Sequence, residues 1–497
     1  MKIFSLTNLG YELIAFEIEI SLMPGLPQIS ILGQANYLVK ESIPKIQSAI
    51  KSQGFKLPKA QHILVDLKPQ NLKKNNMGVE LAIACAILNE TRQIRLNDQG
   101  SRPWLVAGHL SLKGEVTPIE KSLEEFSERH LFNIITVAPT KIDREHFEVR
   151  NLRELKRPKF VSAQKSILQK RPRPRLPDVC FSKAAARLIE IIASGEHACL
   201  LAGSCGSGKS TLASMIAKVL AEPSEIELKE IQKVQKLFCQ SFASNPVTSV
   251  GQTLGGVRPE VIVHHSISPI AFLGGGSRLY PGELTRAHKG TLIMDEFLEF
   301  NSEIQDALRE PLENARLRIA RNGNYLEFPT DFLLVATSNL CQCGEFSMNS
   351  QKSCRCSQAK LKNYLSRLSG PCVDRFQILT FSSLWENQKK EFTLESIDAK
   401  IKKSLEFRQS KRRQAQPNSK LSNAELANFV DQKLVSNFYK FEYLSERRQI
   451  ALMKVARTIA DLEFHAAVGI KHLQEAFEFT ILPFVWLEQA QKANICL

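Results

Sequence analysis

The chain has 497 residues, a formal net charge of +15 and 11 cysteines. This length predicts roughly two to four domains, each long enough to bury a core. The cysteines are too few for a disulfide framework, and no apolar run is long enough to cross a bilayer, so we expect a cytoplasmic protein without a membrane partner. The positive charge favours a polyanion such as nucleic acid as partner, although solvated lysines alone would produce the same balance.

The first 165 residues predict an α+β domain with its own core. Apolar and polar residues alternate at 16–22, which indicates a half-exposed strand, and the apolar runs 62–67 and 104–107 indicate further strands. Helical patterns lie near residues 38–53 and 78–90. We find no nucleotide motif in this part of the chain.

A basic, proline-rich segment follows this domain. Residues 153–177 are rich in Arg, Lys and Pro, a composition that favours an extended, solvated chain. We assign residues 166–177 as an interdomain linker, with an arm that touches DNA as the alternative. A second basic, polar stretch at 408–420 precedes a helical C-terminal segment.

Residues 203–210 match the complete phosphate-loop pattern G-x-x-x-x-G-K-S. An apolar strand at 198–202 leads into the loop, and a helix at 211–221 follows it. The backbone N–H groups and the helix N-terminus would hold the phosphates, Lys209 would neutralise the terminal phosphate and Ser210 would ligate magnesium. We therefore expect ATP and Mg²⁺ here, with nucleotide contacts from Gly203, Ser204, Cys205, Gly206, Ser207, Gly208, Lys209, Ser210 and Thr211.

Two further apolar strands end in polar residues that complete such a site. The run that begins at Thr291 ends in Asp295 and Glu296. Asp295 would hold the magnesium shell with Ser210, and Glu296 would polarise the attacking water. Residues 332–338 form a third strand that ends at Asn339, placed to orient the water or to touch the γ-phosphate. Without the other two strands, Asn339 would be an ordinary turn residue.

A predicted hairpin lies between the second and third of these strands. Residues 302–314 are helical in pattern, and residues 316–328 then alternate on either side of an Asn-Gly pair, a strong signal for a two-residue turn. Arg316 and Arg318 share one face, which would project into a central pore and track a nucleic-acid backbone. A surface ribbon with solvated arginines is an equal alternative. The DNA-binding candidates are Arg316, Arg318 and Arg321.

Two more arginines join Glu296 and Asn339 as catalytic candidates. Arg457 falls on the apolar stripe of a long helical pattern at 445–462, so it needs an anionic partner. That partner would be a nucleotide phosphate reached from a lid domain, or else a structural Asp or Glu. Arg375 follows the third strand and would reach a neighbouring subunit's nucleotide as an arginine finger, with a salt bridge to Asp374 as the alternative.

Four cysteines form two C-x-C pairs that are separated by ten residues. Two such pairs on facing turns would complete a tetrahedral zinc site. Free thiols or redox pairs are the alternative, although a cytoplasmic chain rarely keeps disulfides. Four cysteine ligands would leave no open position, so the zinc would be structural. The proposed ligands are Cys341, Cys343, Cys354 and Cys356; we assign no site to the nearby pair His264-His265.

Together these motifs resemble the magnesium-chelatase-like AAA+ ATPases, specifically the bacterial ComM group, also called YifB. The resemblance covers nearly the whole chain. It rests on the phosphate loop, the four cysteines, His264-His265, Asp374-Arg375 and the segments 273–277, 281–284, 290–296, 368–371 and 454–462. It implies a homo-hexameric, ATP-driven motor that binds DNA and drives branch migration of recombination intermediates.

The resemblance also implies a first domain similar to the proteolytic domain of Lon proteases. Lon-type hydrolysis needs a nucleophilic serine in the turn before a helix. The corresponding turn, residues 73–78, contains no serine, so proteolysis is disfavoured. This turn departs from the family's usual Gly-Ser-containing pattern, and Leu340 stands where the family generally has proline.

The expected fold is therefore α/β. It comprises a Lon-protease-like α+β domain (1–165), the linker (166–177), an AAA+ P-loop core (178–382) and a helical lid (383–497). The expected function is an ATP-dependent DNA translocase or branch-migration helicase. The alternative is a remodelling or chelatase-type subunit that acts on a protein partner, and a Lon-like protease is the least favoured.

Overall fold

The computed structural model divides the chain into two compact units, Met1–Leu168 and Gln169–Leu497. It describes residues 2–9, 12–32, 37–69, 78–96, 102–119, 123, 126–137, 144–163, 173–241, 257–276, 280–321, 324–346, 354–368, 373–386, 388–431, 435 and 445–492. Among these residues, no helix combines the length and the apolar composition that a bilayer crossing requires.

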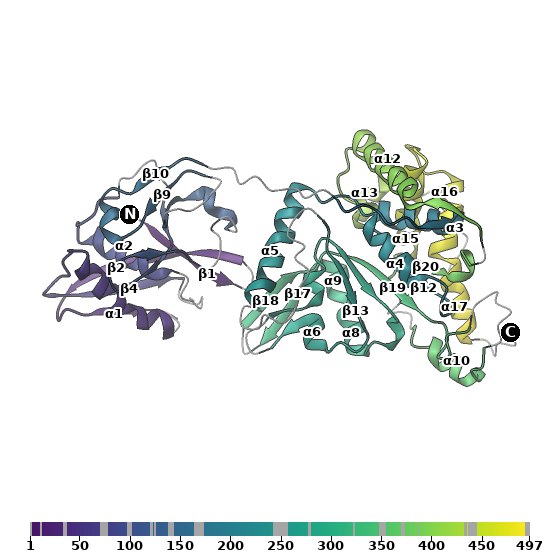
Figure 1. Cartoon of the computed structure of the whole chain (residues 1–497), viewed down its shortest axis with the longest axis horizontal. Coiled ribbons are helices and arrows are strands. Elements are labelled where there is room, and N and C mark those ends of the chain that lie inside the picture. The colour runs from purple at the N-terminus through teal and green to yellow at the C-terminus, as the bar shows by residue number, and fades with distance from the viewer. Residues whose placement is uncertain are drawn as a thin grey trace. The chain divides into compact units, whose positions relative to one another are not determined.

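The first unit is built on a mixed sheet with the strand order β10-β9-β8-β5-β1-β2-β4-β3 (Figure 1). β1 and β4 pair antiparallel with β2, whereas β1, β5, β8 and β9 run parallel to one another. The strands are β1 (Ile3–Leu9), β2 (Glu12–Pro24), β3 (Ile29–Leu32), β4 (Gln61–Lys68), β5 (Trp104–Val106), β8 (Asn133–Val137), β9 (His146–Val149) and β10 (Lys159–Val161). A separate short ribbon pairs β6 (His109–Leu110) with β7 (Val116–Thr117).

Two helices, α1 (Tyr37–Ser52) and α2 (Val79–Glu90), pack with this sheet. The side chains from Val79 to Leu88 in α2 are buried, including the carboxylate of Glu80. Glu80 lies 3.3 Å from Lys45 Nζ and 3.1 Å from His109 Nδ1, so its charge is satisfied inside the unit. The predicted strands and helices of this region are confirmed. The turn residues 73–77, where a serine is absent from the sequence, lie outside the described residues.

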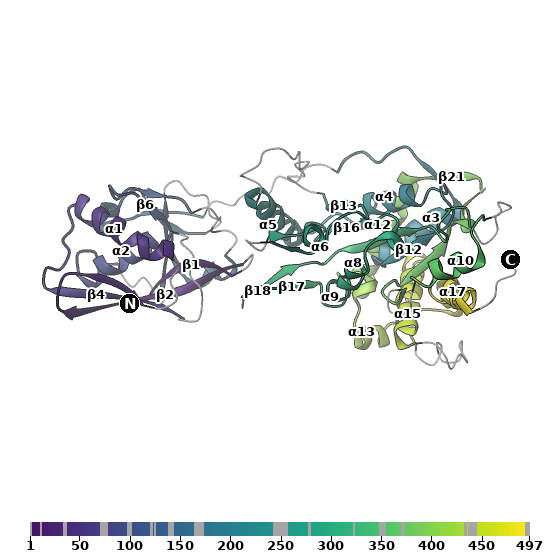
Figure 2. The same ribbon diagram turned by 90° about the horizontal axis from the view of Figure 1, so that it is seen from below.

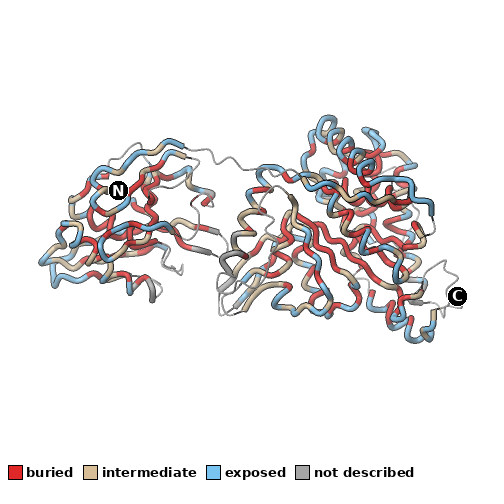
Figure 3. The backbone as a smooth tube through the Cα atoms, viewed as in Figure 1, coloured by how far each residue is buried: buried red, intermediate tan, exposed pale blue. Residues whose placement is uncertain are grey.

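The second unit contains a parallel sheet of five described strands in the order β13-β16-β19-β12-β20 (Figure 1). Its strands are β12 (Cys199–Ala202), β13 (Glu260–Val263), β16 (Thr291–Met294), β19 (Leu333–Ser338) and β20 (Ile378–Phe381). Every residue of β12, β16, β19 and β20 is buried, which Figure 3 shows as continuous segments. Helices cover both faces of such a sheet, so its strands are apolar throughout. Their carboxyl ends meet at one edge and bring the three predicted polar termini together.

The C-terminal helices share a core with this sheet. One apolar cluster joins Leu201 and Ile293 of the strands to Ile459 and Leu473 of the last helices. Among the described residues, the helices of the unit are α3 (Lys183–Gly195), α4 (Lys209–Lys218), α5 (Glu225–Ser241), α6 (Pro269–Leu273), α7 (Glu283–Arg286), α8 (Ser302–Ala307), α9 (Arg309–Asn314), α10 (Gln358–Leu365), α12 (Leu394–Arg412), α13 (Asn423–Ala427), α15 (Glu446–Leu462), α16 (Ile470–Thr480) and α17 (Leu482–Lys492). The region expected as a lid therefore belongs to the same compact unit as the sheet.

The hairpin between β16 and β19 is confirmed. β17 (Arg316–Arg321) pairs antiparallel with β18 (Asn324–Pro329), and Figure 2 shows the two strands as a ribbon that extends from α9. The single helix expected before it is instead two, α8 and α9. Pro311 explains the break, because proline is tolerated in the first turn of a new helix and not in a helix interior.

Residues 166–172 of the expected linker lie outside the described residues, but residues 173–177, before β11 (Cys180–Ser182), contact other parts of the second unit. Arg173 donates hydrogen bonds to Asp398, at 2.8 Å, and to the Leu220 carbonyl, at 3.2 Å. Residues 173–177 line a cavity of about 310 Å³ together with the end of α4. An arginine with a carboxylate and backbone carbonyls within reach is better satisfied there than as part of a free linker.

Candidate nucleotide-binding site

The phosphate loop connects β12 to the N-terminus of α4. Gly206 and Gly208 have φ values of 77° and 84°, in the left-handed region that favours glycine. A Cβ atom would meet nothing within 4 Å at either position, so backbone conformation and not crowding demands glycine there. Cys205, Gly206, Gly208, Ser210 and Thr211 are exposed, which leaves the loop and the helix N-terminus open to a phosphate.

The Lys209 side chain is folded over the loop. Its Nζ donates to the carbonyl oxygens of Ser204, at 2.6 Å, and Gly203, at 3.1 Å, and to Asn339 Oδ1 at 3.3 Å. Burial lowers the pKa of Lys209, although the nearby Cys205 and Asp295 oppose this shift. No carboxylate of the described chain forms an ion pair with the ammonium group, so its charge is left for an anionic ligand.

Asp295 lies where the expected magnesium ligands should meet. Ser210 Oγ donates to Asp295 Oδ1 at 3.0 Å, and the Thr337 hydroxyl donates to the same oxygen. A hydroxyl and a carboxylate are oxygen ligands that Mg²⁺ accepts. Ser210 and Asp295 therefore fit a bound Mg²⁺ ion. No sequence motif marks Thr337, because its role depends on the pairing of β19 with β16, where Met294 lies opposite Ala336 and the next residues, Asp295 and Thr337, meet.

Glu296 directly follows this aspartate in a strained backbone conformation. Its φ and ψ are 56° and 51°, in the left-handed region that non-glycine residues rarely adopt and that is enriched at functional sites. The Glu296 N–H donates to Thr337 Oγ1 at 3.2 Å. The side chain is 47% exposed, and its Oε2 lies 3.3 Å from Nδ1 of His265. His265 had no site assigned to it from the sequence, and the structure brings it next to Glu296.

Residues after β20 also contact the phosphate loop. Trp385 Nε1 donates to the Ser207 carbonyl at 2.9 Å, and Ser204 Oγ donates to Glu386 at 2.9 Å. On the other side, the Cys205 N–H donates to the Gly344 carbonyl at 2.7 Å. The pairing of β12 with β20 brings Trp385 and Glu386 to the loop, and its pairing with β19 brings Gly344 there, so no local pattern marks these residues.

The two arginines expected at the nucleotide have other partners in the structure. Arg375 donates to the Gln305 carbonyl and lies 3.5 Å from Asp306 on α8. Arg457 is fully buried, 2.9 Å from Asp461, and also donates to the Ala466 carbonyl at 2.8 Å. Neither is brought to the phosphate loop of its own chain. For Arg457 the structure supplies the structural Asp that the sequence left open as its alternative partner.

The hairpin arginines share one acidic neighbour. Arg316 lies 2.6 Å and Arg318 lies 3.0 Å from the carboxylate of Glu327 on the opposite strand. Both arginine side chains remain about two-thirds exposed, with 67% and 68% of their surface accessible. The side chain of Arg321 lies outside the described residues. The Glu327 carboxylate therefore accepts hydrogen bonds from two guanidinium groups on this face.

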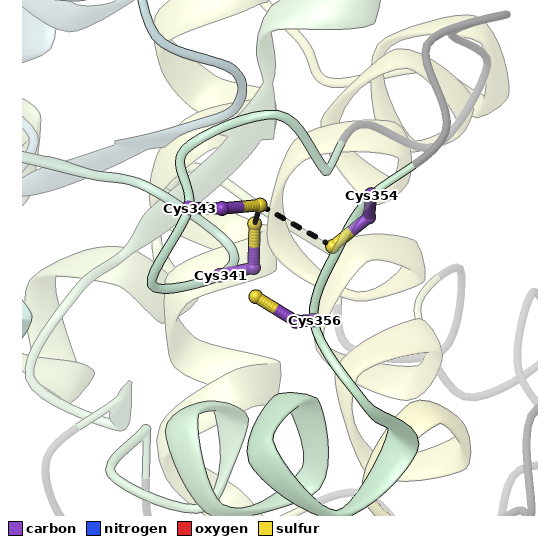
Figure 4. Close-up of side chains that lie close together, drawn as sticks. All are labelled: Cys341, Cys343, Cys354 and Cys356. Atoms are coloured by element: carbon purple, nitrogen blue, oxygen red, sulfur yellow. Dashed lines mark hydrogen bonds between the residues drawn. The ribbon is translucent and has the colours of Figure 1, made fainter.

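The four cysteines converge as their spacing predicted (Figure 4). Their sulfur atoms all lie within 4.8 Å of one another, with Cys343 Sγ 3.2 Å from Cys341 Sγ and 3.5 Å from Cys354 Sγ. Sulfurs bound to one zinc at about 2.3 Å lie about 3.8 Å apart, so the residues fit a tetrahedral ion. Burial opposes ionisation of Cys343, but backbone N–H groups of Glu345 and Arg355 and the Cys341 thiol lower its pKa to about 6.

A second cluster, Glu463, His465 and His472, also places three possible metal ligands together. The Gly469 N–H donates to His472 Nδ1 at 2.9 Å, so a neutral His472 carries its proton on Nε2. That nitrogen faces Glu463 at 3.2 Å and would have to lose the proton to bind a metal. The cluster is therefore better described as a hydrogen-bonded network.

Comparison with known proteins places this site in a family. The family described as magnesium chelatase, subunit ChlI, matches residues 175–390, and related ChlI families match residues 18–138 and 393–480. YifB of Escherichia coli is 30% identical over 503 residues, which cover 95% of each chain, and the competence protein ComM of Haemophilus influenzae is 28% identical over 509 residues, 96% of each. The magnesium-chelatase 38 kDa subunit of Cereibacter sphaeroides is 26% identical over 162 residues, which cover 31% of this chain and 48% of that subunit. The chain therefore belongs to the magnesium-chelatase-like AAA+ family that includes YifB and ComM.

Proposed function

We propose that the chain is an ATP-hydrolysing motor that acts on DNA, specifically a translocase or branch-migration helicase for recombination intermediates. The observation that carries the hydrolytic part is the meeting of Lys209, Ser210, Asp295 and Glu296 at one edge of the sheet. Lys209 would bind the terminal phosphate, and Ser210 and Asp295 would hold Mg²⁺, which neutralises charge on the phosphates when bound. Glu296 would accept the proton of the attacking water.

The hairpin supports the DNA part of the proposal. Between Glu296 and Arg316 the chain runs without a break through η4 (Phe297–Glu299), α8 and α9. A displacement at the hydrolytic carboxylate would therefore reach the hairpin through a short series of packed helices. DNA phosphates would replace Glu327 as the partners of Arg316 and Arg318 and would release bound counterions.

The test measures ATP turnover on four-way junction, duplex and single-stranded DNA beside a no-DNA control. We expect DNA to stimulate turnover. Replacing both Arg316 and Arg318 with alanine should weaken binding on all sequences and lower the slope of log affinity against log salt by about two. Arg309→Ala removes a similarly exposed arginine outside the hairpin and serves as the matched control. A purified protein that neither binds DNA at low salt nor responds to it would refute the DNA motor.

We further propose that the chain works as a ring in which Arg375 contacts the nucleotide of the next subunit as an arginine finger. Its position before β20, where it contacts Gln305 and Asp306 of α8 and not its own phosphate loop, supports this role. Each of Glu296→Gln and Arg375→Ala should be inactive alone. A mixture of the two should regain turnover, because some interfaces then combine an intact Glu296 with an intact Arg375. A mixture that stays inactive would contradict the shared site.

The cysteine cluster is proposed to hold structural zinc. Replacing Cys341 and Cys354 with serine should abolish zinc retention and destabilise the loop that carries Gly344, since metal binding contributes to folding. Cys180→Ser, at a cysteine outside the cluster, is the control. Unchanged zinc stoichiometry in the double variant, measured by metal analysis, would remove the assignment.

The match to a magnesium-chelatase subunit supports a second candidate. In that case the ATPase would remodel a protein partner. Its turnover would be indifferent to DNA, and it would not change when Arg316 and Arg318 are replaced. The DNA experiment above therefore separates the two functions.

A further inference from the structure

A groove in the first unit lies beside the beginning of β3 and the C-terminal end of α1. Its volume is about 640 Å³, which is within the range of ligand-binding cavities. Ile29 of β3, Ile63 of β4 and Phe55 line it with side chains that belong to the core of the unit. An apolar floor of this kind stabilises a ligand that brings apolar side chains of its own.

Three lysines also line this groove and give it a positive charge. Lys51 lies in the last turn of α1, and Lys56 and Lys59 lie in the segment that leads to β4. All three are exposed, and none of them forms an ion pair with a described residue. The described residues that line the groove include no aspartate or glutamate. The positive charge is therefore available to an acidic ligand, in contacts that salt would screen.

The groove adjoins an edge of the sheet. β3 is the last described strand in the order of the sheet and pairs in parallel with β4, from Ile29 opposite Ile63 to Leu32 opposite Asp66. No described strand pairs with its other side, where main-chain N–H and C=O groups can accept a further strand. Leu32 is 43% exposed, and Leu26, shortly before the strand, is 83% exposed. An uncovered edge with exposed leucines is the kind of edge that pairs with another chain.

We propose that this groove binds an extended peptide segment of a partner protein, in which acidic residues flank apolar ones. The peptide adds to β3 as a further strand, its apolar side chains contact the floor, and its carboxylates meet the lysines. This role goes beyond the proposed action on ATP and DNA, because every lining residue belongs to the first unit. The groove also lies at the beginning of β4, whereas the turn at 73–78, which corresponds to the Lon nucleophile turn, follows the end of that strand in the sequence.

A peptide fits this groove better than a nucleic acid does. Single-stranded nucleic acids bind by stacking their bases on exposed aromatic rings, in addition to phosphate contacts. Phe55 is the aromatic residue among the described lining residues, but it is only 6% exposed, and Lys156 Nζ lies 5.0 Å from the centre of its ring. The groove therefore offers no stacking platform, whereas the main-chain groups of β3 match those of a peptide.

The test measures the fluorescence anisotropy of labelled peptides with the full-length protein at low salt. The probe is a fluorescein-labelled peptide with leucine, phenylalanine and leucine in its centre and a pair of aspartates at each end. We expect it to bind, whereas a peptide with lysines in place of the aspartates should not. N-methylation of alternate backbone amides should weaken binding at least about tenfold in one of the two alternating patterns, because only one set of amides faces β3.

Charge reversal in the groove tests the role of the lysines. Lys51→Glu together with Lys59→Glu should weaken binding of the probe at least about tenfold, because the aspartates then face like charges. Lys113→Glu together with Lys159→Glu makes the same change in net charge at exposed lysines of the first unit outside the groove. This control should bind the probe as the wild type does. Both double variants should keep wild-type ATP turnover with and without DNA.

The outcomes separate this proposal from the DNA motor. A wild type that does not bind the probe, or a Lys51→Glu, Lys59→Glu protein that binds it as tightly as the wild type, would refute the peptide site. If labelled oligothymidine binds in place of the peptide and is lost on the same charge reversal, the groove is a nucleic-acid surface and the proposal is overturned. None of these results changes the test of DNA-stimulated turnover, which has its own readout.

Discussion

The carboxyl edge of the parallel sheet and the C-terminal helices both gather charged side chains, but they treat those charges differently. At the edge, Lys209 bonds to carbonyl oxygens and an amide, and Glu296 is half exposed. Among the helices, Arg457 and Arg412 both pair with Asp461, whose side chain is 2% exposed. Charges at the edge are left with capacity for a ligand, whereas Arg457, Arg412 and Asp461 bind one another within the core.

This difference separates binding residues from structural ones. A buried charge without its partner is costly, so every charge in a permanent core must find a partner within the chain. A charge that serves a ligand must keep part of its capacity free, at some cost to the unliganded fold. The internal partners of Arg457 therefore argue for a structural role, and the incomplete pairing of Lys209 argues for a binding role.

The largest effect on ATP turnover is expected for Glu296→Gln, at the carboxyl edge of the sheet. We expect it to lower kcat about a hundred- to ten-thousand-fold, because the amide cannot accept a proton from water. Nucleotide binding and the unfolding midpoint should stay unchanged, since the side chain is half exposed. Glu303→Gln, at an exposed position on α8, is the matched control for turnover and stability. An equal loss of nucleotide binding would show that Glu296 is not the water-activating group.

The opposite result is expected for Arg457→Ala. Removing it breaks a buried ion pair, leaves the Ala466 carbonyl without its donor and empties a fully buried site, which should lower the free energy of unfolding by about 3–5 kcal/mol. Arg447→Ala, on the same helix, breaks only an exposed ion pair with Glu313 and should cost at most about 1 kcal/mol. Urea unfolding followed by circular dichroism measures both. A stable Arg457→Ala protein that fails to bind nucleotide would reverse the structural assignment.

A smaller effect is expected from Asp331, which lies between β18 and β19 and pairs with Lys420 at 2.6 Å and Lys289 at 2.9 Å. Burial opposes ionisation of Asp331, but the two ammonium groups overcome this and lower its pKa from 3.8 to about 2. The depressed pKa contributes about 2 kcal/mol of stability above pH 4, and this contribution is lost as the pH falls from about 4 to 2. Asp331→Asn should reduce the loss of unfolding free energy between about pH 4 and pH 2. Asp178→Asn, at an exposed position, should leave this loss unchanged. Parallel acid unfolding curves for wild type and Asp331→Asn would contradict the linkage.

The sequence was sufficient where a short motif and its flanking elements act together. The phosphate loop, the strand that ends in Asp295, the hairpin around residues 322–323 and the cysteine pairs each lie within about 20 residues, and each is found as a unit in the structure. Local backbone preferences and side-chain periodicity act over this range. The division of residues 302–314 into two helices also has a local cause, Pro311. The helical periodicity of the apolar residues continues across the break and therefore predicted a single helix.

The tertiary structure decided which distant residues meet. Strand pairing brings Thr337 to Asp295 and Trp385 to the phosphate loop, and the end of β13 brings His265 to Glu296. In the packed helices, Arg457 pairs with Asp461. Its position on an apolar stripe of the sequence was equally compatible with a bound phosphate. Sequence patterns state what a side chain requires, but only the order of strands and the packing of helices determine which partner fulfils that requirement.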